Sequence, residues 1–109
     1  MSLHVHAVAL ETVVALRPLV PLIQRRDRAL AVQLARAASS VVLNIAEAEY
    51  SDPGNRRARL YSAAGSANES RSALRVAIAW GYLAERQAAA PIALLDRVLA
   101  MLWRLGRPP

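Results

Sequence analysis

Apolar side chains recur along this chain every three or four residues, the spacing that places them on one face of an α-helix. The first such segment covers about residues 3–17. Pro18 and Pro21 then end or kink it, because proline lacks a backbone donor and clashes with the preceding turn. The second segment covers about residues 28–48, and Asp27, in the polar turn before it, is a suitable N-cap. These patterns predict two helices.

Two more helices are expected further along the chain. The third begins after the cap residue Asp52, with Pro53 at its first position, and runs to about residue 83. The fourth begins at Ala90 and Pro91 and ends at Gly106, which two prolines follow. The apolar positions expected in the core are Val5, Val8, Ala9, Val13, Leu16, Leu30, Leu34, Ala37, Val41, Ile45, Leu60, Ala63, Ala67, Leu74, Ile78, Gly81, Leu94, Leu95, Val98, Met101, Leu102 and Leu105. Short connections between long helices imply antiparallel neighbours, so the sequence predicts an all-α, up-and-down four-helix bundle forming one domain over residues 1–109.

Composition narrows the class of protein. Hydrophobic residues make up 55% of the 109, much of that fraction alanine, and the chain has no cysteine for disulfides or thiolate chemistry. No stretch approaches the ~18 consecutive apolar residues of a membrane span. The N-terminus lacks the basic and apolar regions of a signal peptide, so we expect a cytoplasmic protein without a membrane partner. The net charge is +6 and all 14 basic residues are arginine. One explanation is an anionic partner, which the planar guanidinium suits, and the alternative is a GC-rich coding sequence that favours arginine.

A polar stripe adjoins the apolar face on each of the second and third expected helices. Its members on the second helix are Gln33, Arg36, Ser40, Asn44 and Glu47, and those on the third are Ser62, Ser66 and Glu69. If the two helices are neighbours, the stripes meet at one interface. One interpretation is a carboxylate pair, Glu47 and Glu69, for acid–base or metal chemistry. The favoured interpretation is a hydrogen-bonded seam that fixes the pairing of the helices.

Catalytic and metal-binding patterns are missing from the rest of the sequence. A di-iron bundle needs carboxylates on several helices and Glu-x-x-His elements, but the only histidines, His4 and His6, follow no glutamate. They have no third zinc ligand and no nucleophile motif around them. The four glycines are scattered, so no phosphate-binding loop is expected. The sequence predicts a protein that is not an enzyme and that uses no cofactor and no metal.

The stretch from residue 33 to residue 83 contains three short groups of residues that together form a motif. They are Gln33, Arg36, Ala37, Ser40, Asn44, Ile45, Ala46 and Glu47, then Ala64, Gly65, Ser66 and Glu69, then Gly81, Tyr82 and Leu83. This set resembles the bacterial four-helix-bundle family first noticed as open reading frames in intervening sequences of large-subunit ribosomal RNA genes. One departure is Ala48, where that family usually has glycine, so the second helix is expected to run on a turn before Asp52.

The resemblance extends to the accessory variability protein of diversity-generating retroelements, a basic, ring-shaped homopentamer that binds nucleic acid and a reverse transcriptase. It implies the bundle fold and a homo-oligomer, with a pentamer as one form. It also raises nucleic acid and a protein such as a reverse transcriptase as partners. A shared fold does not by itself carry a shared role.

Arginine clusters are the candidate nucleic-acid contacts, since phosphate contacts dominate such binding. They are Arg25, Arg26, Arg28, Arg56, Arg57, Arg59, Arg71 and Arg75. The alternative is that these side chains form a solvated or protein-facing surface. The five aromatic residues are dispersed along the sequence, which argues against a dedicated single-strand reader. A competing hypothesis is an adaptor or self-associating module, with Trp80 as an interface anchor among the small residues Gly65, Ala73 and Val76.

Overall fold

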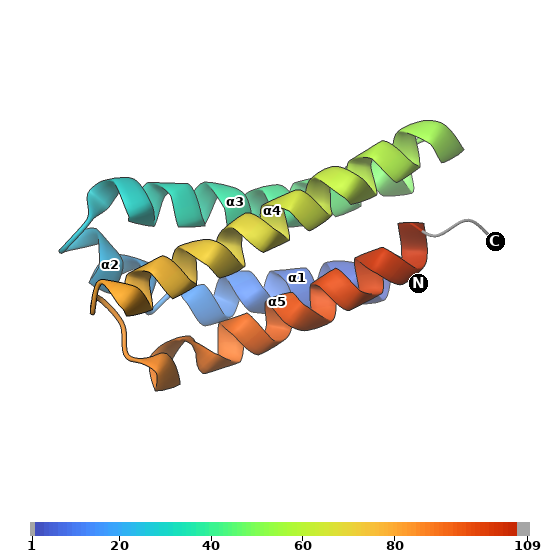
Figure 1. Ribbon diagram of the computed structural model, residues 1–109. Helices are drawn as coiled ribbons and strands as arrows, with labels where there is room; N and C mark the ends of the chain where they lie inside the picture. Colours follow the sequence, from blue (N-terminus) through green and yellow to red (C-terminus); the bar gives the residue numbers. More distant parts are fainter. Residues whose placement is uncertain (1, 107–109) are drawn as a thin grey trace.

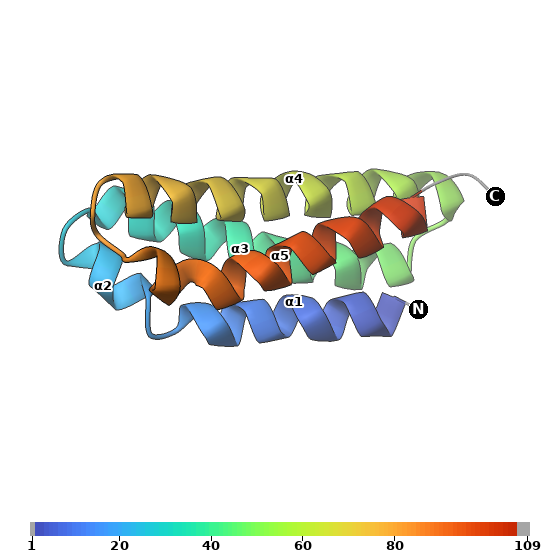
Figure 2. The same cartoon turned by 60° about the horizontal axis from the view of Figure 1, so that its bottom comes forward.

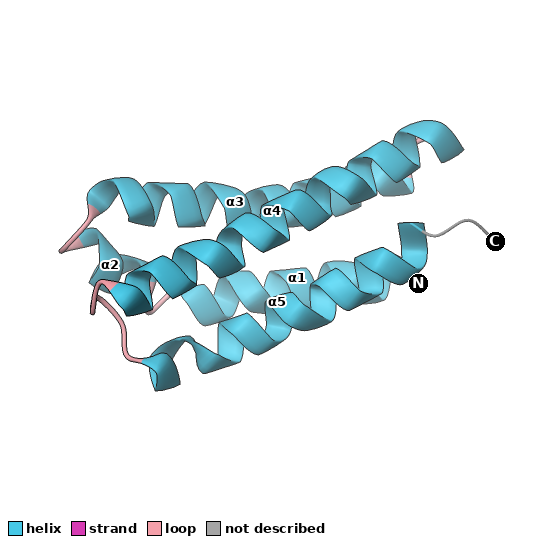
Figure 3. Cartoon of the chain, in the orientation of Figure 1, coloured by secondary structure: helices cyan, strands magenta, loops and turns pink. Residues whose placement is uncertain are grey.

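The computed structural model describes the backbone of residues 2–106 and the side chains of residues 4–106. That part of the chain forms helices and no strand (Figure 3), which confirms the all-α prediction. The helices are α1 (Ser2–Leu16), α2 (Val20–Gln24), α3 (Arg28–Glu49), α4 (Pro53–Ala79) and α5 (Glu85–Gly106). Residues 2–106 therefore contain five helices, where the sequence predicted four.

The extra helix is the five-residue α2, which lies in the connection that follows α1. Pro18 and Pro21 were expected to end or kink the first helix, and α1 does end at Leu16, just before them. Pro21 is the second residue of α2, a position where the missing N–H has no helical partner to lose. Ile23 of α2 is fully buried, so this short turn of helix is held against the core.

Four long helices lie side by side along a molecule that measures 43 × 22 × 19 Å, and consecutive ones run in opposite directions (Figures 1 and 2). Helix α3 packs most extensively on α4, and it also contacts α1 and α2. Helix α5 packs on α4 and α1. The outer faces of α3 and α5 therefore belong to diagonally opposite sides of the molecule.

Aspartate caps begin two of the helices, as the sequence predicted. The Asp27 carboxylate accepts a hydrogen bond from the Leu30 N–H at 3.0 Å, and the Asp52 carboxylate accepts one from the Asn55 N–H, also at 3.0 Å. Each bond satisfies a donor that has no partner within its helix. The bonds from Asn55 lower the pKa of the Asp52 carboxyl, the backbone bond more than the side-chain bond. The prediction that α3 runs on for a turn past Ala48 was wrong, because the helix ends at Glu49, one residue beyond Ala48.

The predicted end of α4 was wrong by four residues. The helix ends at Ala79, and Gly81 adopts a left-handed conformation with φ of +79°. The Tyr82 N–H then donates to the Ala77 carbonyl at 2.8 Å and the Gly81 N–H to the Ile78 carbonyl at 2.9 Å, the Schellman pattern of helix termination. Gly81 thus ends the helix. The prediction that it lies on the apolar face of the helix was wrong.

The predicted start of α5 was also wrong, because the helix begins at Glu85 and contains Pro91. The Gln87 side-chain carbonyl accepts a hydrogen bond from the Ala84 N–H at 2.8 Å, one half of a capping box that starts the helix earlier. Pro91 is itself buried, so packing holds the turn around it although proline removes one helical hydrogen bond. Pro108 and Pro109, which were expected to follow the helix end, lie outside the described residues.

The core is built largely from the predicted apolar faces. All the predicted positions of α3 are buried, whereas five of the other predicted positions are only half-buried: Val13, Ile78, Leu94, Met101 and Leu105. Alanines fill much of the contact between α3 and α4 and allow a close approach of the two backbones. Within residues 2–106, one helix, α3, is long and apolar enough to cross a membrane by length and composition alone, but 44% of its most apolar window is buried inside the molecule. Such burial is typical of a core helix.

Candidate nucleic-acid interface

The two polar stripes meet where α3 packs on α4. The Ser66 hydroxyl donates to the Ser40 hydroxyl oxygen at 2.9 Å across the interface. One end of the interface is marked by Gln33, whose side-chain amide donates to the Glu69 carboxylate at 3.5 Å. These two contacts confirm that the stripes adjoin and define the antiparallel pairing of the helices.

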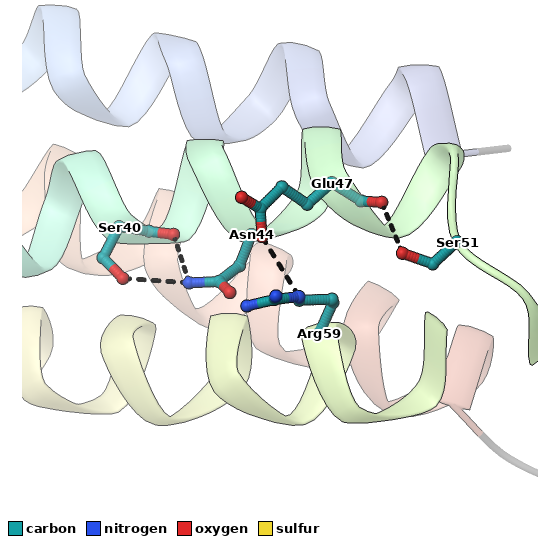
Figure 4. Close-up of polar contacts among 5 residues, drawn as sticks. All are labelled: Ser40, Asn44, Glu47, Ser51 and Arg59. Carbon is teal, nitrogen blue, oxygen red and sulfur yellow. Dashed lines mark hydrogen bonds and ion pairs between the residues drawn. The ribbon is translucent and has the colours of Figure 1, made fainter. Parts of the chain in front are cut away.

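The other end of this seam is drawn in Figure 4. The Asn44 amide donates to the Ser40 hydroxyl at 3.0 Å and to the Ser40 backbone carbonyl at 2.9 Å, both within α3. Glu47 pairs across the interface with Arg59 of α4, at 3.0 Å between Oε2 and Nε. About half of each of these two charged side chains is exposed, so the pair contributes little to stability.

The two carboxylates of the seam do not form a pair. Glu69 contacts Gln33, while Glu47 lies 14 residues further along α3, a rise of about 21 Å at 1.5 Å per residue. At that separation they cannot share a proton, a metal ion or a substrate atom. The structure therefore favours helix pairing over carboxylate chemistry, and the side chains of residues 4–106 include no group of three potential ligands suited to a metal ion.

The seam lies at the rim of the interface and not within it. Ser40, Asn44 and Ser66 are half-buried, but Gln33, Arg36, Glu47, Ser62 and Glu69 are exposed. The fully buried hydroxyl beside it belongs to Ser70, which the sequence analysis did not select; it donates to the Ser66 carbonyl at 2.9 Å. Ser70 could have been found from the sequence because it lies four residues after Ser66, a spacing that returns to the same helix face.

The predicted arginine triplets lie at opposite ends of the molecule. Arg25, Arg26 and Arg28 surround the connection from α2 to α3, whereas Arg56, Arg57 and Arg59 belong to the first turns of α4. The length of α3 separates these two places (Figure 1). Within the second triplet, Arg59 is engaged by Glu47 and Arg56 is half-buried. The six residues therefore do not form one surface.

A second group of arginines lies along α4 and α5. Arg57, Arg71 and Arg75 lie on the α5-facing edge of α4, where Arg71 pairs with Asp96 of α5 at 2.7 Å. Helix α5 adds Arg86, Arg97 and Arg104, which were not predicted from the sequence. Arg97 and Arg104 lie toward the edge of α5 that adjoins α1, where they line a hollow with His4. The spacings of 11 and 7 residues between the three arginines of α5 return to the same helix face and could have revealed them. We call these six arginines the α4–α5 basic face.

Alanines separate the arginines along α5. Ala90, Ala93 and Ala100 are exposed on the same stripe, which is therefore both flat and positive. Of the six arginines, only Arg71 makes an ion pair with a carboxylate of the described residues. The positive charge of this face is thus largely unneutralised.

Aromatic side chains gather near the end of the molecule where α4 ends. The rings of Trp80 and Tyr82 are stacked with centroids 6.5 Å apart, and the Arg26 guanidinium lies 5.5 Å from the Tyr82 centroid. The Tyr82 hydroxyl donates to Asp27 at 3.4 Å. Burial, together with the Asp27 carboxylate, raises the pKa of Tyr82. Trp80 and Val76 are exposed, as the interface hypothesis requires, but Ala73 is buried between α3 and α4.

Comparisons with known proteins support this architecture. A family model described as 23S rRNA-intervening sequence protein matches residues 2–104. A crystal structure of a protein of unknown function from the S23 ribosomal protein family of Bacteroides thetaiotaomicron superposes with a TM-score of 0.88. It is 21% identical, and the match covers 95% of this chain and 99% of the other. No curated protein sequence matches the chain. At this identity the structural likeness shows the fold alone.

Proposed function

The chain belongs to the 23S rRNA-intervening sequence protein family, and from this premise we propose that it is a non-enzymatic protein that binds RNA through the phosphate backbone. The observation that carries the proposal is the α4–α5 basic face. Arginine presents a planar fork of donors that fits phosphate oxygens, and the exposed alanines between the arginines let a strand approach closely. The family's link to ribosomal RNA favours RNA as the nucleic acid. We regard α2 as part of a connection, so that the four long helices form an up-and-down bundle presenting this face.

Binding of this kind depends strongly on salt, because each neutralised phosphate releases condensed counterions. We expect the protein to retard a short RNA duplex at about 50 mM salt and to release it as salt is raised to about 200 mM. The slope of log K against log salt concentration, measured by fluorescence anisotropy, then counts the phosphate contacts.

The variant that tests the face is the double substitution Arg97→Gln, Arg104→Gln. Each lost phosphate contact lowers the magnitude of the slope by about one, so we expect a decrease of about two. The matched control is Arg36→Gln, which removes an exposed arginine on α3, on the diagonally opposite side of the molecule. Absence of binding at low salt, or an equal loss in the control, would contradict the proposal.

A second function, self-association, is favoured by the outer face of α3. Val32, Ser39, Leu43 and Tyr50 share this face at spacings of seven and four residues, and Leu43 is 64% exposed. Apolar side chains lined up on one exposed face are typical of protein interfaces. We expect light scattering to detect a homo-oligomer that Leu43→Asp dissociates, and a monomeric wild type would exclude this function.

A further inference from the structure

A groove lies between α4 and α5 at the end of the molecule where α4 begins and α5 ends. Its volume is about 270 Å³, and its lining is mainly apolar, from Leu60, Leu99 and Leu102. Two aromatic side chains from different helices line it as well: Tyr61, 73% exposed, and Trp103, 66% exposed. These residues are far apart in the sequence, so only the packing of α4 on α5 brings them to one place.

The pairing of the two helices explains why the groove is hollow. Arg71 and Asp96 lie opposite each other, and in an antiparallel pair the same register places Ala64 opposite Trp103 and Gly106 opposite Tyr61. Each large ring thus faces a small residue across the groove. A Cβ atom added at Gly106 would meet no heavy atom within 4 Å, so space remains beside Tyr61.

Charge complements the shape of the groove. Arg57 lines it, and the lining contains no carboxylate. No carboxylate of the described residues lies within ion-pair distance of Arg57. A flat aromatic surface beside an unneutralised arginine fits a planar ring that is joined to a phosphate. Proteins that bind single-stranded nucleic acid combine these two elements, with bases stacked on aromatic rings and basic side chains along the backbone.

We propose that this groove binds an unpaired nucleobase of single-stranded RNA. The base stacks on Tyr61 and Trp103, and Arg57 contacts the adjacent phosphate. The inference rests on the proposed RNA-binding function and extends it from the phosphate backbone to the base. A peptide or a second protein copy in the groove is an alternative occupant that the experiment separates.

Tryptophan fluorescence reports the contact directly, because the chain has two tryptophans and Trp80→Phe leaves Trp103 as the sole one. We expect a short oligoadenylate RNA to quench Trp103 in this variant at about 50 mM salt. In the wild-type background, Trp103→Ala should weaken binding of the same oligonucleotide by roughly 5- to 100-fold. Trp80→Ala removes an equally exposed tryptophan outside the groove and should leave the affinity unchanged.

Three further variants, at two other positions, keep the test independent of folding defects at position 103. Tyr61→Ala shortens a mostly exposed side chain and should weaken binding of the single-stranded RNA, whereas Tyr61→Phe retains the ring and should leave the binding unchanged. Ala64→Leu fills the groove opposite Trp103 and should also reduce single-strand affinity. Circular dichroism of each variant confirms that it is folded.

The possible results separate the inference from the function on which it rests. Duplex binding without any quenching of Trp103 by the single strand would overturn the nucleobase site and leave the phosphate-binding proposal intact. Quenching by the single strand without duplex retardation would support the site and overturn the duplex interaction. Absence of both would remove both proposals. Loss of affinity in Trp80→Ala but not in Trp103→Ala would place the stacking surface elsewhere and overturn the inference.

Discussion

Alanine substitutions at two glycines near and within α4 are expected to change stability in opposite directions. Gly81 follows the helix with φ of +79°, while Gly65 lies in the middle of α4. A Cβ atom added at either position meets no heavy atom within 4 Å. Steric contacts therefore do not contribute, and the backbone conformation alone decides each result.

At position 81 the backbone of the substituted residue must adopt the left-handed conformation, which costs an L-residue roughly 1–2 kcal/mol. Leaving that conformation would break the hydrogen bonds of Gly81 and Tyr82 that terminate the helix. At Gly65 the conformation is helical, and alanine is favoured over glycine by about 0.5–1 kcal/mol. The two variants should thus differ by about 1.5–3 kcal/mol in the free energy of unfolding, with the wild type between them.

Urea denaturation followed by circular dichroism measures both free energies, and equal m-values would show that the denatured state is unchanged. A Gly81→Ala variant as stable as the wild type would refute the argument that the left-handed turn requires glycine. Destabilisation by Gly65→Ala would instead mean that another surface packs closely on this exposed glycine, as in an oligomer.

Three further predictions concern the core, the seam and the helix cap. Leu74 is fully buried, so Leu74→Ala should lower the free energy of unfolding by about 2–5 kcal/mol, whereas Val14→Ala, at an exposed position of α1, should change it by less than about 0.5 kcal/mol. Glu47→Gln breaks an exposed ion pair and should cost less than about 1 kcal/mol in urea titrations; a larger loss would mean that the seam is more than a rim contact. The folded state lowers the pKa of Asp52, so its ionised cap stabilises the protein above its ordinary pKa of 3.8, and this contribution is lost as the pH falls through the lowered value. Asp52→Asn caps without titrating and should flatten the stability profile in that acidic range; parallel profiles for the variant and the wild type would contradict the assignment.

Local chemistry was sufficient to predict most of the secondary structure. Asp27 and Asp52 act on donors three residues away, and the apolar spacing of α3 depends only on the helical period, so both could be read without knowledge of neighbouring helices. One error arose where non-local packing competes with local preference. Buried Pro91 stays inside α5 because the core packs around it, although its local preference is to start a helix.

The candidate site depended more on tertiary structure than the fold did. The sequence predicted that the α3 and α4 stripes would meet if the two helices were neighbours. It could not tell that 14 residues of α3 separate Glu47 from Gln33, the contact of Glu69. It also treated the aromatic residues as dispersed, although Tyr61 and Trp103 line one groove.

By itself, then, the sequence determined the four long helices to within about five residues at their ends, which face of each is apolar and that the protein is strongly basic. These properties follow from residue spacing, local hydrogen bonds and composition. Only the tertiary structure decided which arginines share a surface and which aromatic rings meet, because both depend on the register between α4 and α5. That register depends on the packing of residues distant in the chain, such as those around Arg71 and Asp96, and no local pattern specifies it.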